Sequence, residues 1–238
     1  MVSVYCMAKA QWVAGVDGAQ KGWVVAYLPP DRDHEAYLTR YETFQQVKTS
    51  VIALGCSIVG VDMPIGLQLG GTRQSDREAR RRLGSRRSTL FPTPSSVVLE
   101  ATTYEDALKR SRDQTGKGLS IQTWNLVPQI REVRNTIQPV DSETFIECHP
   151  ESSFAAMVGD SLVSKKTPEG IQQRLVVLRN IVPRIDTIVE KLPKKCNIDD
   201  ALDAFAAAWS AKRFSQREAI ILGGDEYDEQ GYPLRIVI

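Results

Sequence analysis

Short apolar runs separated by polar turns open the chain, and the first of them ends in an aspartate. Residues 13–16 are apolar and lead into Asp17, and a second apolar run at 23–28 follows a turn that contains Gly18 and Gly22. Such runs on both sides of a glycine-containing turn predict an antiparallel pair of strands. A carboxylate at the end of a buried strand needs donors, a cation or water. Asp17 is therefore either a site residue or a residue that caps this turn with its own side chain.

The pattern then changes from strand to helix and back to strand. Residues 36–41 predict a third strand, and residues 43–54 predict an amphipathic helix that a capping box begins at Thr43. The run at 57–62 is apolar almost throughout and again ends in an aspartate, Asp62. A continuously apolar strand is typical of parallel pairing with both faces covered. This order indicates an antiparallel meander followed by a helical crossover to a parallel strand.

Residues 67–140 interrupt this alternation and predict a helical insertion. Its first helix is predicted at 76–83, begun by a capping box of Ser75 and Glu78, and another at 104–114. Seven arginines lie in the first part of this segment: Arg73, Arg77, Arg80, Arg81, Arg82, Arg86 and Arg87. Such a charge run is either a solvated helix face or a surface that binds phosphate. The residues that we expect to contact phosphate are Lys21, Arg81, Arg82, Arg86 and Arg87.

Strand and helix alternate again toward the carboxyl end of the chain. A strand predicted at 144–147 ends in a third acidic residue, Glu147. A long helical segment follows, and its apolar three-four repeat indicates packing or a self-association face that would make a homo-oligomer. The last helix, predicted at 197–209, carries Asp200 and Asp203 three residues apart on one face. Two final apolar runs predict a terminal hairpin.

The composition limits the class of protein. With 238 residues, 42% hydrophobic and 25% charged, the chain is typical of a soluble globular protein, and we expect residues 1–238 to form one domain. A formal net charge of +1 gives no general attraction to nucleic acid. Four cysteines without a C-x-x-C motif indicate reduced thiols in a cytoplasm and disfavour zinc, even at adjacent Cys148 and His149. No membrane span or signal peptide is predicted, and residues 1–6 are expected to be a loose extension.

The acidic residues at strand ends and on the last helix suggest a shared site. In an open α/β sheet, the site lies beyond the carboxyl ends of the strands. The acidic residues that we expect to converge there, as candidate catalytic residues, are Asp17, Asp62, Glu147, Asp200 and Asp203. Converging carboxylates repel one another unless cations lie between them, and Mg²⁺ or Mn²⁺ is the natural partner of oxygen ligands. Two such ions would support hydrolysis of a phosphodiester bond, and arginines would contact the nucleic-acid backbone.

The sequence resembles an uncharacterised bacterial and archaeal family described as predicted RNase H-like nucleases. The motifs that carry the resemblance are G-V-D-G-A-Q-K-G-W at 15–23, V-D-M-P-I-G-L at 61–67, R-R-L-G-S-R-R-S-T-L-F-P-T-P at 81–94, L-S-I-Q-T-W-N-L-V-P-Q-I at 119–130, E-C-H-P-E-S-S-F at 147–154 and D-D-A-L-D-A-F-A-A-A-W at 199–209. The resemblance implies an RNase H-like mixed five-stranded sheet of order 3-2-1-4-5 with flanking helices, and a helical insertion after the fourth strand.

The placement of the acidic residues is also similar to that of RuvC-type resolvases. This similarity implies metal binding by Asp17, Asp62, Asp200 and Asp203. Those resolvases usually have Glu where this chain has Asp62, which gives a shorter reach. Glu147 has no settled counterpart and is either an added ligand or a substrate contact.

Three functions remain open at this point. The first is a metal-dependent nuclease that acts by a two-metal-ion mechanism on DNA or RNA. The second is a non-catalytic protein that keeps the acidic residues for metal or nucleic-acid binding. The third is a phosphotransferase similar to actin and sugar kinases, in which the turn after Asp17 would hold nucleotide phosphates. Nucleotide-dependent thermal stabilisation would identify the third.

Overall fold

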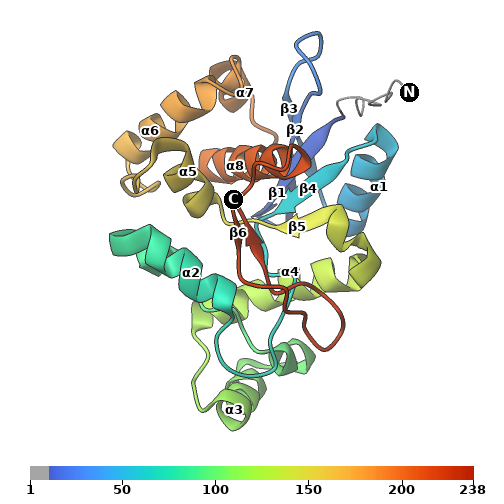
Figure 1. The fold of residues 1–238 in the computed structure, drawn as a ribbon, viewed down its shortest axis with the longest axis vertical. Helices are drawn as coiled ribbons and strands as arrows, with labels where there is room; N and C mark the ends of the chain where they lie inside the picture. Colours follow the sequence, from blue (N-terminus) through green and yellow to red (C-terminus); the bar gives the residue numbers. More distant parts are fainter. Residues whose placement is uncertain (1–10) are drawn as a thin grey trace, which may run out of the picture.

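The apolar runs at the start of the chain form an antiparallel meander, which two later strands join in parallel (Figure 1). The structure, a computed structural model, describes residues 11–238, so the extension predicted for residues 1–6, with Cys6, lies outside these residues. The strands of the sheet are β1 (Val13–Ala19), β2 (Gly22–Leu28), β3 (Tyr37–Tyr41), β4 (Ile58–Val61) and β5 (Phe145–Glu147). Their order is β3-β2-β1-β4-β5. The predicted RNase H-like sheet is therefore confirmed.

Eight α-helices lie within the described residues, and five of them begin directly after a residue whose side chain accepts a hydrogen bond from the first turn. They are α1 (Phe44–Leu54), α2 (Gln74–Leu83), α3 (Tyr104–Thr115), α4 (Ile121–Thr136), α5 (Pro150–Val158), α6 (Pro168–Arg179), α7 (Ile185–Glu190) and α8 (Ile198–Ser215). Short 3-10 helices are η1 (Gly84–Thr89), η2 (Ser96–Glu100) and η3 (Pro139–Glu143), and the terminal hairpin is formed by β6 (Ile221–Leu222) and β7 (Ile236–Val237). The side chains of Thr43, Thr103 and Thr167 cap α1, α3 and α6, respectively.

Two local expectations fail. The capping box predicted for Ser75 and Glu78 is wrong, because α2 already begins at Gln74 and has no side-chain cap. Glu78 instead accepts hydrogen bonds from the Gln74 side chain and from the backbone N–H of Gly223. Helix α5, which begins at Pro150, is absent from the sequence-based expectations.

Of the cysteines, Cys56, Cys148 and Cys196 are free thiols within the described residues.

Helices cover both faces of the sheet. On one face, α1 and α4 pack their apolar side chains against β1, β2, β4 and β5. On the other face, α8 lies against β1 and β2, and α5, α6 and α7 complete that layer (Figure 1). This double cover accounts for the near-continuous apolar character of β1 and β4. None of the described helices is both long and apolar enough to cross a membrane.

The backbone of α8 lies directly on the centre of the sheet, because two strand residues there have no side chain. A methyl group at Gly15 would lie 2.1 Å from the carbonyl oxygen of Ala204. A methyl group at Gly60 would lie 2.5 Å from the carbonyl oxygen of Ala207. Small residues on both elements thus permit an approach that larger side chains would prevent. This contact also fixes where α8 carries Asp203.

Replacing Gly15 by Ala is expected to lower the free energy of unfolding by about 3 kcal/mol or more. The added methyl group would meet backbone atoms of α8, which cannot move without displacing the helix. Gly118→Ala is the matched control, because its methyl group would lie 3.5 Å from its nearest neighbour, an ordinary contact. Urea denaturation of both variants measures the difference. Equal midpoints for Gly15→Ala and the wild type would contradict the close approach.

The segment between β4 and β5 forms the predicted helical insertion. Its helices α2, α3 and α4 make up the lower part of the molecule in Figure 1. Residue Pro128 lies inside α4, which is a single helix from Ile121 to Thr136. Because α4 also covers one face of the sheet, the insertion is joined to the core and reaches the carboxyl ends of β1 and β4.

Candidate metal centre

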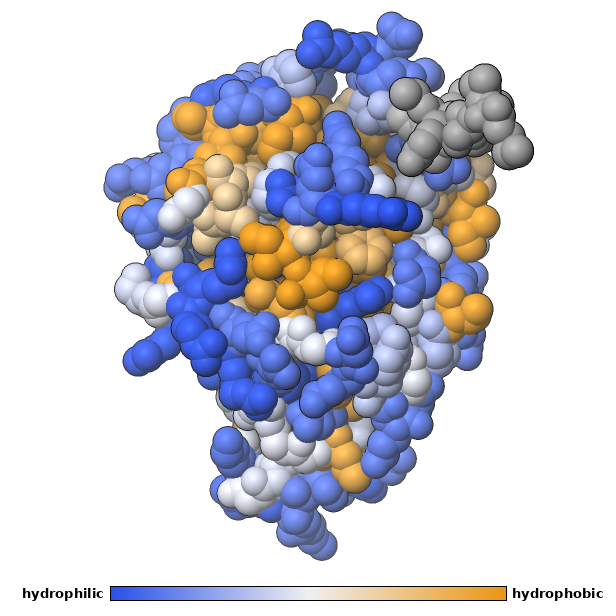
Figure 2. Space-filling view, viewed as in Figure 1, coloured by the Kyte–Doolittle hydropathy of each residue, from blue (hydrophilic) through white to orange (hydrophobic). Residues whose placement is uncertain are grey.

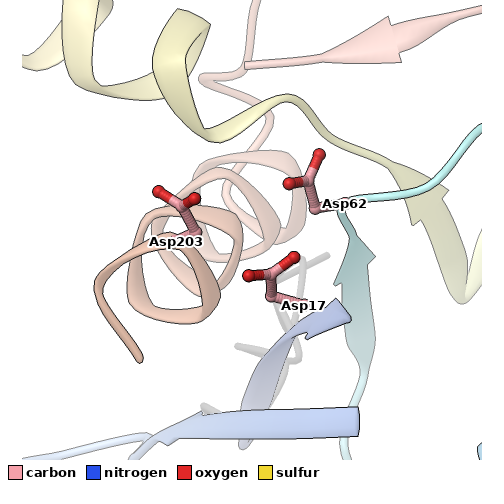
Figure 3. Close-up of side chains that lie close together, drawn as sticks. All are labelled: Asp17, Asp62 and Asp203. Carbon is pink, nitrogen blue, oxygen red and sulfur yellow. The ribbon is translucent and has the colours of Figure 1, made fainter. Parts of the chain in front are cut away.

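Three aspartates from distant parts of the chain come together at the carboxyl ends of the parallel strands (Figure 3). Asp17 lies in β1, Asp62 directly follows β4, and Asp203 lies in α8. One carboxylate oxygen from each lies within 4.8 Å of the other two. Parallel pairing of β1 with β4 places the first two side by side, and the N–H of Asp62 donates to the carbonyl of Val16 at 2.8 Å. The close contact of α8 with Gly15 places the third aspartate, Asp203, beside them.

Asp203 has one carboxylate oxygen with a partner and one without. Its side chain is 1% exposed. Oδ2 accepts a hydrogen bond from Nζ of Lys165, whereas Oδ1 is buried and has no hydrogen-bond partner. An unpartnered buried carboxylate oxygen is costly. A cation held jointly with Asp17 and Asp62 would satisfy this oxygen.

The pKa values of the three carboxyl groups are all raised, in each case chiefly by burial. Burial, followed by the charges of Asp62 and Asp203, raises the pKa of Asp17 well above its ordinary range. Burial and the charge of Asp203 raise the pKa of Asp62 to about 7. Burial raises the pKa of Asp203 to about 6, although Lys165 opposes this shift. A carboxyl group with a pKa raised in this way is fully ionised at neutral pH only when a cation lies close to it.

Lys165 is the positive charge that the chain itself supplies. Burial disfavours its ammonium form, but the charge of Asp203 outweighs burial and raises the pKa of Lys165. Lys165 forms its ion pair with Asp203, whereas Asp17 and Asp62 have no ion-pair partner among the described residues, so a deficit of positive charge remains there. Hard divalent ions such as Mg²⁺ and Mn²⁺ fit an all-oxygen ligand set of this kind.

Without divalent ions, the protein is expected to lose about 1–2 kcal/mol of stability between pH 6.5 and pH 8.5. The pKa of Asp62 is about 7 in the folded state against an ordinary value of 3.8, so the folded protein binds more protons than the unfolded chain. Stability is therefore present at low pH and falls as the pH rises through the folded pKa. Burial lowers the pKa of His149 to about 4, against an ordinary value of 6.5. The titration of His149 makes the stability rise with pH, but only below pH 6.5, outside this interval.

Urea denaturation in EDTA at these two pH values measures this loss. Adding Mn²⁺ at pH 8.5 should recover it, because ligand binding to the folded state stabilises that state. A stability that rises across this interval would contradict the repulsion among the three carboxylates.

The other two acidic residues predicted for the site lie outside this group of three. Asp200 lies one turn before Asp203 in α8, and its Oδ2 accepts the backbone N–H of Asn197 at 3.0 Å as a capping box. Glu147 is buried at the end of β5 and binds the guanidinium of Arg73 through both oxygens, at 2.5 and 2.7 Å. It also accepts the N–H of Ile65 at 2.8 Å. Its oxygens are thus occupied by donors from the chain.

The predicted phosphate-binding residues are spread over different surfaces. Arg86 lines the cavity that contains the three aspartates. Arg81, Arg82 and Arg87 are exposed outside the lining of that cavity, and Lys21 is exposed in the turn between β1 and β2. Figure 2 shows a strongly hydrophilic surface over α2. Most of the seven arginines are exposed to solvent, as the alternative of a solvated helix face predicts.

Sequence reasoning did not anticipate Lys165 or the cavity itself. The cavity has a volume of ≈ 380 Å³ and is lined by the three aspartates, by Lys165 and Lys166, and by residues of the insertion. Lys165 lies in the loop before α6, thirty-eight residues from Asp203. No spacing rule relates two residues so far apart. The pair of adjacent lysines was the only local signal.

These features define an RNase H-like α/β protein with a carboxylate centre at the ends of β1 and β4. The chain belongs to the family described as protein of unknown function (DUF429), whose model matches residues 15–227. The predicted membership of an uncharacterised family is confirmed.

Two solved structures show distant similarity to the chain. The RuvC structure from Thermus thermophilus is 11% identical, with 87% of this chain and 96% of that chain covered and a TM-score of 0.39. T. thermophilus RuvC in complex with Holliday junction substrate is 12% identical, with 87% and 95% covered and a TM-score of 0.36. No curated protein matches the sequence.

Proposed function

We propose that this protein is a hydrolase of phosphodiester bonds that depends on Mg²⁺ or Mn²⁺, and that Asp17, Asp62 and Asp203 hold the ion. The observation that carries the proposal is a group of three carboxylates with one oxygen each within 4.8 Å of the others, in which the buried Oδ1 of Asp203 has no hydrogen-bond partner. When bound, such an ion polarises a phosphoryl oxygen and lowers the pKa of water. A two-metal mechanism would also require Asp200, the nearest further carboxylate on α8.

The residues around the three aspartates supply the remaining functions. Lys165 Nζ holds Asp203 through Oδ2, and it would be free to contact a phosphate oxygen once a metal ion neutralises that carboxylate. Arg86 and Lys166 line the same cavity and offer further contacts to phosphate. Nucleic acid, either DNA or RNA, is proposed as the partner because of these cations.

The test is Mn²⁺ binding by calorimetry together with Mn²⁺-dependent hydrolysis of bis(p-nitrophenyl) phosphate. Asp203→Asn is expected to weaken Mn²⁺ binding and hydrolysis at least about 100-fold, since even groups that only support metal ligands contribute 10–100-fold. Asp113→Asn, at an exposed position of α3, is the matched control and should behave as the wild type. Absence of both binding and hydrolysis in the wild type would refute the proposal.

A second candidate is a non-catalytic protein in which Lys165 permanently neutralises the carboxylates. The ion pair between Lys165 and Asp203 favours it. Lys165→Met separates the two candidates. In a metal centre, removing this ammonium group takes away a competing cation and should tighten Mn²⁺ binding by roughly tenfold. In a metal-free ion-pair centre, the same change should only lower the stability, and no Mn²⁺ binding would be found.

A further inference from the structure

The cavity that contains the three aspartates is lined in part by the helical insertion. Asp17, Asp62 and Asp203 contribute to its lining. Two parts of the insertion line the same cavity, namely residues 88–94 after α2 and the face of α4 that carries Leu126 and Ile130. The carboxylates thus lie in a partly open pocket and not on a flat surface.

The segment 88–94 that lines the cavity is attached to the rest of the protein. Leu90 is buried against Ala79 and Leu83 of α2. The carbonyl of Leu90 also accepts a hydrogen bond from Nη2 of Arg80 at 3.0 Å. The start of α2 is in turn joined to β5 by the buried ion pair between Arg73 and Glu147. Displacing this segment would therefore require breaking contacts that involve both helix and sheet.

The volume of the cavity sets a limit on what can reach the carboxylates. At ≈ 380 Å³, it lies near the lower end of the roughly 300–1,000 Å³ typical of pockets that enclose small ligands. A phosphate within a base-paired duplex is carried on a helix far wider than such a pocket. A base can stack on a side chain within such a pocket only when it is unpaired or extruded from the duplex.

The walls have the two surfaces that a nucleotide requires. Phe91 lines the cavity and is 47% exposed, so its ring is available to stack on a base. Met63 and Leu126 add apolar wall nearby. Arg86, Lys165 and Lys166 provide positive charge for phosphate. An apolar wall with an exposed ring and a charged floor matches one base and its phosphate.

Building on the proposed function, we propose that the substrate is a phosphodiester on an unpaired nucleotide, with its base against Phe91 and its phosphate at the three aspartates. The nucleotide belongs either to a single strand or to a small free phosphodiester. A nucleotide in a duplex or in branched duplex DNA would have to be extruded to place its base in this position.

The first experiment compares five substrates with the wild-type protein and Mn²⁺. They are an end-labelled unpaired oligonucleotide, the same strand in a duplex, a four-way junction made with it, a dinucleotide, and bis(p-nitrophenyl) phosphate. The unpaired oligonucleotide is expected to be hydrolysed on the order of 100-fold faster than the duplex and the junction, because a paired nucleotide must first be extruded. If the dinucleotide is hydrolysed as fast as the oligonucleotide, the substrate is a small free phosphodiester. If the dinucleotide is hydrolysed much more slowly, the substrate is a single strand.

Two outcomes would overturn this inference in distinguishable ways. If the duplex or the junction is hydrolysed at least as fast as the single strand, and Asp17→Asn abolishes it, the proposed function holds and the substrate inference is wrong. If none of the five substrates, including bis(p-nitrophenyl) phosphate, is hydrolysed with Mn²⁺ or Mg²⁺, the proposed function fails and this inference fails with it.

The second experiment tests the role of Phe91. Phe91→Ala is expected to raise KM for the oligonucleotide roughly tenfold through the loss of base stacking. The effect on the same oligonucleotide with an abasic site at the hydrolysed position, which offers no aromatic ring there, should be clearly smaller. Tyr227→Ala removes an aromatic ring that is 61% exposed outside the cavity and is the matched control. Equal losses on both substrates would show that Phe91 does not bind a base.

Discussion

Asp17→Asn is expected to abolish metal-dependent hydrolysis and, without metal at pH 8, to raise the free energy of unfolding by about 1–3 kcal/mol. The activity falls because the asparagine removes a charged ligand, a loss on the order of 10³-fold or more given that supporting groups alone contribute 10–100-fold. The stability rises because burial and the charges of Asp62 and Asp203 already raise the pKa of Asp17. A neutral amide at this position avoids the cost that burial and the two neighbouring charges impose on the ionised form of Asp17.

Calorimetry with Mn²⁺ and urea denaturation in EDTA measure the two effects on the same protein samples. Asp113→Asn serves again as the exposed control, for which neither quantity should change. The activity is expected to fall while the free energy of unfolding rises, and this combination distinguishes a metal ligand from a residue that only caps a turn. A variant that loses activity and stability together would instead identify Asp17 as a residue that only caps its turn, through the 2.8 Å hydrogen bond from Gly18 N–H to its Oδ1.

Arg73→Met is expected to lower the free energy of unfolding by about 3–5 kcal/mol. Arg73 is 2% exposed, and its guanidinium binds Glu147 and Asp76, both of which are also buried. It further donates to the carbonyl of Gly66 at 2.8 Å. Removing the arginine leaves two carboxylates in the interior without their cation. Breaking a buried ion pair in this way has a large effect because the remaining charge has no compensation.

Arg77→Met is the matched control, since Arg77 lies on the same helix with its side chain exposed. Its effect on the free energy of unfolding should stay within about 0.5 kcal/mol, as for most surface changes.

Glu147→Gln adds a separate test of the role predicted for Glu147. A loss of stability with kcat retained would assign Glu147 to the support of α2. A loss of kcat at unchanged stability would place it among the catalytic residues.

Local pattern predicted the strands and most helices because these features depend on neighbouring residues, whereas the order of the strands in the sheet was implied by the family resemblance. The apolar runs before Asp17 and Asp62 specify buried strands, and Thr43 and Gly55 mark the two ends of α1. Helix α2 shows the limit of this reasoning. Ser75 and Glu78 have the spacing of a capping box, but Glu78 binds Gly223 near the terminal hairpin, and the helix starts earlier.

For the candidate site, the sequence determined that acidic residues end two parallel strands and recur on the last helix. This much follows from strand direction alone, because parallel neighbours end at the same edge. Only the tertiary structure decided which acidic residues meet. The contact of α8 with Gly15 selects Asp203, whereas Asp200 caps the helix and Glu147 binds Arg73.

The same distinction explains why the position of Lys165 and the cavity could not be predicted. Both depend on packing between elements that are far apart in the chain, such as Lys165 against α8. Periodicity and capping report only on interactions within a few residues. The sequence by itself therefore determined the strands, the helices and the supply of carboxylates, and long-range packing alone decided the group of three, its ammonium partner and the cavity that contains them.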